Sequence, residues 1–110
     1  MNEDKEKNQF IEKLKILNEV KDDIIKEIQR IKPKDISKTQ AQNLRESAVQ
    51  TGSIEEVLLY IDYQCAKKKI PKDSGRELMT LIEKHKAEGI EIIRYMMGVF
   101  ARHVIIQNEE

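Results

Sequence analysis

The stretch that decides the fold is IEIIRYMMGVFARHVII, residues 90–106. Apolar side chains fall on most sides of a helix drawn over these residues, so most of its circumference must be kept from water. Gly89 immediately precedes the stretch and is the expected break from the element before it. The sequence therefore predicts a helix over 90–106 that is the central and most buried element of a helical fold.

Repeated capping signals predict three more helices upstream of this stretch. A serine stands three residues before a glutamine or glutamate at three places: Ser37 and Gln40, Ser53 and Glu56, and Ser74 and Glu77. This is the spacing of a capping box, which marks the beginning of a helix. The predicted helices run over about 38–50, 54–70 and 75–86. We expect Gly52 to supply the left-handed residue that closes the first of them, and Lys67, Lys68 and Lys69 to end the second.

A long amphipathic helix is predicted over about residues 4–31. Its apolar residues recur at helical spacing: Phe10, Leu14, Leu17, Ile24, Ile28 and Ile31. Pro33 should end it, because proline lacks the N–H and disfavours helical geometry at the residue before it. The pattern leaves open whether this helix packs on the bundle or projects from it. The predicted fold is all-α, a compact antiparallel bundle of four to five helices, with one domain over 1–110 and the core bundle over 37–106.

Composition says more about the compartment in which the protein works than about its partners. The 110 residues carry 20 Lys and Arg against 20 Asp and Glu, so there is no strong field of one sign, and attraction to a polyanion must come from a local patch. Cys65 is the single cysteine, which fits a reducing compartment. No apolar run approaches the roughly 20 residues that cross a bilayer. We expect a cytoplasmic protein that does not enter the membrane.

Residues with catalytic or metal-binding chemistry are sparse. His85 and His103 have no second histidine or cysteine three or four residues away, which is the spacing of a helical metal-ligand pair. Cys65 falls on an apolar helix stripe, where a thiol usually acts as a small hydrophobic group. The abundant carboxylates are typical of solvated helix faces. The sequence predicts a protein that is not an enzyme, with no cofactor and no metal site.

The densest group of cations lies at the turn between the helices predicted over 54–70 and 75–86. It comprises Lys67, Lys68, Lys69, Lys72 and Arg76, and only Asp73 and Glu77 offset it. Neutralisation of phosphates by lysine and arginine is the basis of sequence-independent nucleic-acid binding. The alternative is an ordinary solvated helix end.

A second basic feature lies along the last helix, where Arg94, Gly98 and Arg102 recur every four residues. This stripe should face an anionic or carbonyl-rich surface. Alternatively, the arginines pair with Glu88, Glu91 or an acidic group on another helix, while Gly98 permits close packing of helices.

Three short segments carry a family resemblance. They are Thr39-Gln40-Ala41-Gln42-Asn43-Leu44, then Tyr63-Gln64-Cys65-Ala66-Lys67, and then Arg94-Tyr95-Met96 leading into Val99-Phe100-Ala101. In order and separation they resemble the small helical subunit of type III-A CRISPR effector complexes, over about residues 37–106. In that family a basic residue stands where this chain has Gln42, and an arginine where it has Lys67.

The resemblance implies a non-catalytic subunit of an antiviral ribonucleoprotein, whose partners are guide RNA, target RNA and the other effector-complex subunits. Carried over by position, Gln40, Gln42 and Lys67 would approach the RNA. Lys68, Lys69, Lys72 and Arg76 extend this set from the local charge cluster.

The alternative function is that of a helical protein–protein adaptor or regulator. In that case the first helix would enter the groove of a partner or associate with its own copy in a homo-oligomer.

Overall fold

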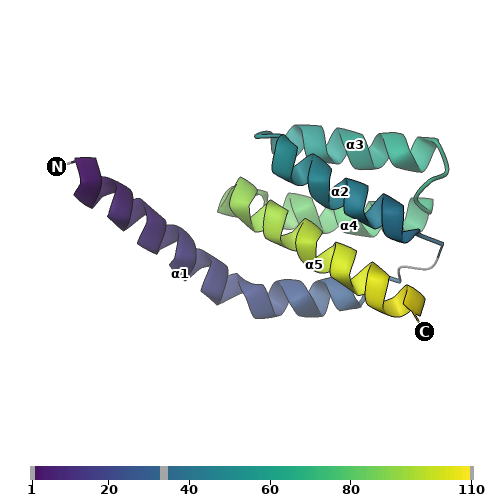
Figure 1. Cartoon of the computed structure of the whole chain (residues 1–110), viewed down its shortest axis with the longest axis horizontal. Helices are drawn as coiled ribbons and strands as arrows, with labels where there is room; N and C mark the ends of the chain where they lie inside the picture. Colours follow the sequence, from purple (N-terminus) through teal and green to yellow (C-terminus); the bar gives the residue numbers. More distant parts are fainter. Residues whose placement is uncertain (1, 33–34, 110) are drawn as a thin grey trace.

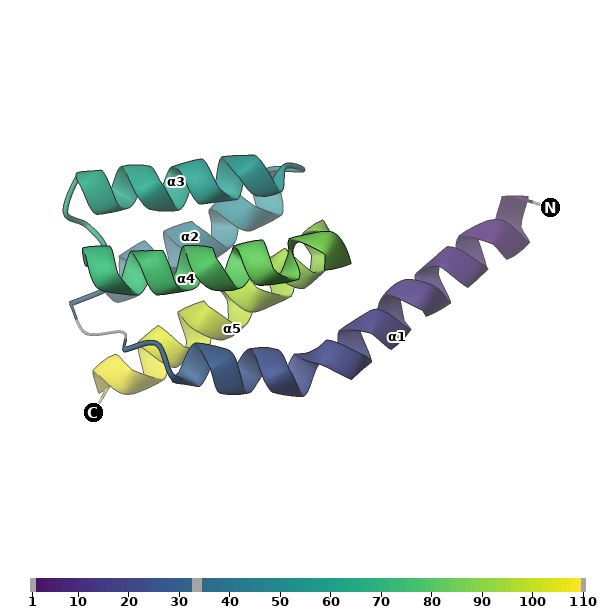
Figure 2. The same cartoon turned by 180° about the vertical axis from the view of Figure 1, so that it is seen from behind.

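The chain forms a succession of α-helices joined by short connections. The computed structural model describes residues 2–32 and 35–109, and the side chains of 7–12, 14–32 and 35–108. The helices are α1 (Asn2–Gln29), α2 (Lys38–Gln50), α3 (Ile54–Ala66), α4 (Lys72–His85), the short 3₁₀ helix η1 (Lys86–Glu88) and α5 (Ile90–Glu109). Consecutive α-helices run in opposite directions (Figures 1 and 2). The prediction of an all-α antiparallel bundle with a long first helix is confirmed.

Helix α5 is the centre of the packing, as its sequence predicts. It lies against α1, α2 and α4, while α3 packs on α2 and α4. Its buried side chains are Ile92, Ile93, Met96, Met97, Phe100, Ala101 and Val104. Gly89 has a φ of 103°, a conformation that glycine adopts at little cost, and it separates η1 from α5 at the predicted break.

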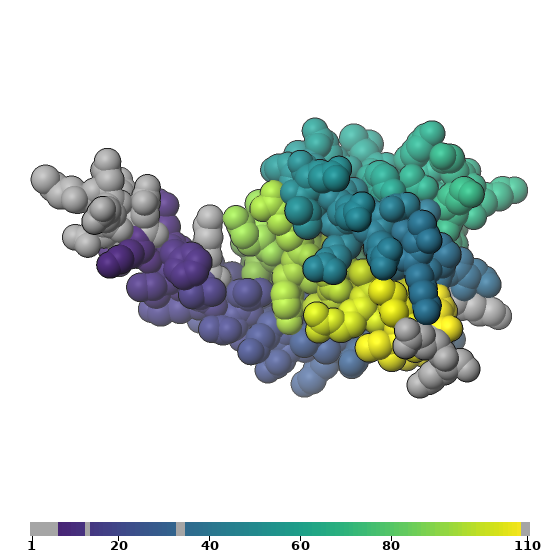
Figure 3. All heavy atoms as spheres, viewed as in Figure 1, coloured from purple at the N-terminus to yellow at the C-terminus, as the bar shows by residue number. Residues whose placement is uncertain are grey.

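Helix α1 is too long for the rest of the bundle to cover its whole length. Its 28 residues extend about 42 Å, against about 30 Å for the 20 residues of α5. Ile24 and Ile28 near its C-terminus and Ile31 just after it are buried, whereas Phe10 and Leu14 are 62% and 42% exposed. The N-terminal half therefore projects from the bundle as an arm (Figures 1 and 3). Pro33, the predicted end signal, lies outside the described residues.

The end of α2 differs from the prediction. Gly52 does not adopt a left-handed conformation, and Thr51 leaves the helix in an extended conformation, with a φ of −94° and a ψ of 149°. The cause is Arg94 of α5, whose Nε donates to the Ala48 carbonyl at 3.0 Å and whose second guanidinium nitrogen donates to the Thr51 carbonyl at 3.0 Å. Carbonyls at a helix end need partners. Because Arg94 provides them, the left-handed turn predicted at Gly52 is not needed.

No helix in the described part of the chain has both the length and the apolar character required to cross a membrane.

Candidate nucleic-acid interface

The basic cluster is positioned by the way α3 ends. The helix stops at Ala66, not at residue 70, because Lys68 has a φ of 62°. The Lys69 N–H donates to the Gln64 carbonyl at 2.9 Å, and the Lys68 N–H to the Cys65 carbonyl at 3.0 Å. These two bonds form a Schellman motif, which usually has glycine at the left-handed position. The motif turns the chain sharply and places three consecutive lysines outside both helices.

Helix α4 begins immediately after this turn and packs closely on α3. A Cβ added to Gly75 would overlap the Cys65 sulfur atom, so a glycine is required where the two helices approach. The predicted cap at Ser74 is wrong, because α4 already starts at Lys72, after Pro71. The Ser74 hydroxyl instead donates to the Lys32 carbonyl at 2.9 Å and fastens the α1–α2 connection to α4.

The α3–α4 turn and the start of α4, which carry the five predicted cations, lie at the end of the bundle opposite the arm (Figures 1 and 2). All five are exposed: Lys67, Lys68, Lys69, Lys72 and Arg76. None of them forms an ion pair with any side chain that the structure describes. Lys67 places its ammonium 5.0 Å from the centre of the Tyr63 ring, a cation–π contact on the exposed side of α3. We call these five residues the basic turn.

A hollow of about 350 Å³ lies beside the basic turn, between α3 and α4. Lys72 and Arg76 line it together with Asp62, Cys65, Ala66 and Met79. Burial raises the pKa of the Cys65 thiol, and the neighbouring Asp62 carboxylate raises it further. A raised pKa disfavours the reactive thiolate, so the chemistry available in this hollow is charge and hydrogen bonding from Lys72 and Arg76.

The two glutamines assigned by the resemblance lie on α2, with different exposure. Gln40 is only 8% exposed, and its backbone N–H donates to the Ser37 hydroxyl at 3.0 Å, as predicted for a cap. Its side-chain amide nitrogen is buried without a hydrogen-bond partner among the described residues. Gln42 is exposed in a hollow that it shares with Arg45. None of the basic-turn cations lines that hollow.

The two arginines of the α5 stripe lie in different surroundings. Arg94 meets the carbonyl-rich end of α2, one of the alternatives that its spacing suggested. Gly98 faces open space, so the close packing proposed there is wrong, and Gly75 is the glycine that has that role. Arg102 is exposed in a groove between α1 and α5.

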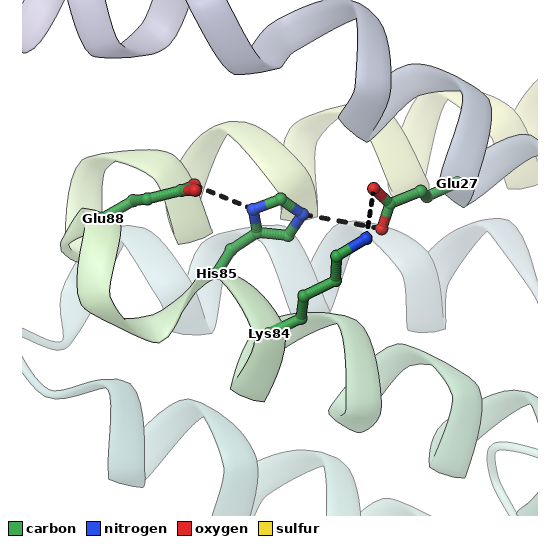
Figure 4. Close-up of polar contacts among 4 residues, drawn as sticks. All are labelled: Glu27, Lys84, His85 and Glu88. Atoms are coloured by element: carbon green, nitrogen blue, oxygen red, sulfur yellow. Dashed lines mark hydrogen bonds and ion pairs between the residues drawn. The ribbon is translucent and has the colours of Figure 1, made fainter.

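A polar cluster that the sequence did not predict joins α1 to the end of α4 (Figure 4). Glu27 accepts from the Lys84 ammonium at 3.0 Å, and its other oxygen lies 3.5 Å from the Nε2 atom of His85. His85 is 5% exposed, and its Nδ1 atom lies 2.8 Å from Glu88. Glu27 and His85 are 58 positions apart, so spacings of three or four residues in the sequence do not reveal this contact.

Electrostatics in this cluster favour the charged form of Glu27. Burial alone would raise the pKa of its carboxyl. The hydrogen bond from Lys84, together with the charges of Lys84 and His85, outweighs burial and lowers the pKa below its ordinary value. The cluster therefore acts as an ionic contact that fastens α1 to α4.

Among the described residues no three histidine, cysteine or acidic side chains converge on a point where they could hold a metal ion. Comparison of the chain with protein-family models, with curated proteins and with solved structures gave no match.

Proposed function

We propose that this protein is a non-catalytic RNA-binding subunit that contacts the RNA backbone through the basic turn. One observation carries the proposal: five exposed cations at one end of the bundle lack ion-pair partners among the described side chains. These five cations lie within a ten-residue segment that contains one acidic residue, Asp73. A phosphate chain is a ligand that would neutralise several of them at once.

The type of RNA complex comes from the resemblance described above. By that resemblance, the subunit would lie along guide and target RNA in a cytoplasmic type III-A CRISPR effector complex, beside other subunits. Lys67 then corresponds to the family's basic position, and the exposed Tyr63 beside it offers an aromatic face for a base. Gln42 is reachable from solvent, whereas little of Gln40 is.

The test is fluorescence anisotropy with a labelled single-stranded RNA at rising salt. We expect the variant Lys67→Ala, Lys68→Gly, Lys69→Ala to bind on the order of a hundredfold more weakly at about 0.1 M salt, because three phosphate contacts are lost. Glycine replaces Lys68 because it suits the left-handed position there. Equal binding by this variant and the unaltered protein would refute the proposal.

A matched control removes the same number of charges elsewhere. Lys7, Lys15 and Lys21 are exposed on α1. Replacing these three lysines by alanine changes the net charge of the molecule by the same amount. We expect that control to keep its affinity, because the proposed contact is local to the basic turn.

A second candidate function, a protein–protein adaptor, is favoured by the arm of α1. Phe10, Ile11 and Leu14 are 62%, 48% and 42% exposed. Phe10 and Leu14 continue the helix face that is buried from Ile24 onward, and Ile11 lies to one side of it. Adjacent exposed apolar side chains on a helix are typical of a surface that associates with a partner or with a second copy.

The adaptor function is tested by Phe10→Ser, Ile11→Ser, Leu14→Ser in sedimentation velocity and partner-capture experiments. Removing the whole of α1 would also remove Ile24 and Ile28 from the core, so substitution is the cleaner change. Loss of self-association or of a partner, with RNA binding unchanged, would support the adaptor function. Unchanged association in both experiments would contradict it.

A further inference from the structure

Helix α4 carries a stripe of polar side chains that continues away from the basic turn. Lys72, Arg76, Thr80 and Lys84 recur every four residues, and all four are exposed. Residues at this spacing follow one side of a helix. Lys72 and Arg76 belong to the basic turn, whereas Thr80 and Lys84 lie one and two turns farther along α4.

The stripe borders a groove between α4 and α1. This groove has a volume of about 440 Å³, and Arg30, Arg76, Thr80 and Lys84 are among the residues that line it. Arg76 also lines the hollow beside the basic turn. It therefore stands between the two depressions, so a chain crossing the turn can pass Arg76 and enter the groove.

Some charged side chains in the groove already have an ion-pair partner within the protein, and others do not. Glu27 is paired with Lys84 at 3.0 Å, so these two charges largely cancel. Arg30 and Arg76 form no ion pair with a side chain in the described part of the chain. The Thr80 hydroxyl donates to the Arg76 carbonyl at 2.8 Å, so it cannot also donate to a ligand. Two guanidinium groups are left to bind, with Glu77 as the opposing charge.

We propose that the α1–α4 groove is a second phosphate-binding site, in which Arg30 and Arg76 bind the nucleic-acid backbone after it leaves the basic turn. The proposal rests on the proposed RNA-binding function. Guanidinium groups suit this role because they donate two parallel hydrogen bonds to phosphate oxygens and stay charged. Glu77 repels the same ligand and weakens the site.

The groove is tested by one substitution that removes a positive charge, one that removes a negative charge, and one matched control. Arg30→Ala should lower the slope of log affinity against log salt by about 0.7, the value for one phosphate contact on a single strand. Glu77→Gln should raise RNA affinity by about fivefold at about 0.1 M salt, the change that corresponds to one phosphate contact on a single strand. Arg102→Ala removes the same group from the groove between α1 and α5 and should change neither quantity.

The outcomes separate this proposal from the one on which it rests. If the Lys67, Lys68, Lys69 variant loses affinity and Arg30→Ala lowers the slope while Arg102→Ala does not, the groove is supported. If the lysine variant loses affinity but Arg30→Ala behaves like Arg102→Ala, the groove proposal alone is overturned. If neither the lysine variant nor Arg30→Ala differs from the unaltered protein, both proposals fail. Thermal melts of each variant confirm that the fold is intact.

Discussion

Lys68 adopts a backbone conformation that is unfavourable for any residue with a side chain. It holds the left-handed position of the Schellman motif, with a φ of 62°, although a side chain there costs roughly 1 kcal/mol more than glycine. The capping signals in the sequence did not reveal this turn, because three lysines in a row do not indicate which of them turns left-handed. A lysine occupies a position where glycine would be more stable, which is consistent with a use for its charge.

Replacing Lys68 by glycine should stabilise the fold by roughly 0.5–1 kcal/mol, since the strain is removed. Thermal or urea unfolding measures the change. Lys68→Ala is the control, because it removes the same charge and keeps the strained conformation. A gain of similar size in the alanine variant would show that charge repulsion, and not backbone strain, was relieved.

Gly75 is the residue that sets the separation of α3 and α4. Its replacement by alanine should destabilise the protein by about 1–3 kcal/mol, as expected for overpacking against the Cys65 sulfur atom. Adding Cys65→Ala to Gly75→Ala should recover part of this loss, because the overlapping atom is gone. Additive losses in the double variant, measured by denaturant unfolding, would rule out the direct contact.

At the scale of helices, the sequence predicted which elements exist far better than how they end. The apolar circumference of residues 90–106 and the caps at Ser37 and Ser53 depend on local patterns, and they led to α5, α2 and α3. The end of α2 and the role of Ser74 depend on residues distant in the chain. Arg94 donates to the carbonyls of Ala48 and Thr51, and Ser74 donates to the Lys32 carbonyl, so neither contact could be predicted from neighbouring residues.

The Arg94 contact should be one of the largest single polar contributions to stability. We expect Arg94→Ala to cost about 1.5–3 kcal/mol, because two partly buried carbonyls lose a charged donor. Arg94→Lys should fall between the alanine variant and the unaltered protein, since an ammonium cannot reproduce the planar fork. Chemical denaturation provides the measurement, and a loss below about 0.5 kcal/mol in the alanine variant would show that water replaces the arginine without penalty.

The contact between α1 and α4 should depend on pH through Glu27. Its pKa is lowered in the folded protein, so its contribution is present above the unfolded value and is lost as pH falls through the folded value, below 4.5. We expect Glu27→Gln to lower stability by about 1 kcal/mol at neutral pH, and by progressively less as the pH falls below 4.5. A cost that stays constant over this pH range would mean that the charge of Glu27 is not involved.

In the whole molecule, the basic turn and the apolar arm of α1 form two separate surfaces. Their residues could be identified in the sequence, but their relative positions could not. The basic turn lies at one end of the bundle and the apolar arm extends from the other (Figures 1 and 2). Sequence pattern identified the five cations of the turn. It did not identify the groove between α1 and α4, because Arg30 and Arg76 come together only when the two helices pack. RNA binding at one end and association through the arm are compatible in one subunit.

The most direct test of the central claim is the salt dependence of RNA binding by the unaltered protein and by the variant Lys67→Ala, Lys68→Gly, Lys69→Ala. The basic turn predicts a linear fall of log affinity with log salt for the unaltered protein. It also predicts a slope that is shallower by about 2 in the variant, from three lost phosphate contacts of about 0.7 each. Parallel lines of equal slope would contradict the claim that these lysines bind the RNA backbone.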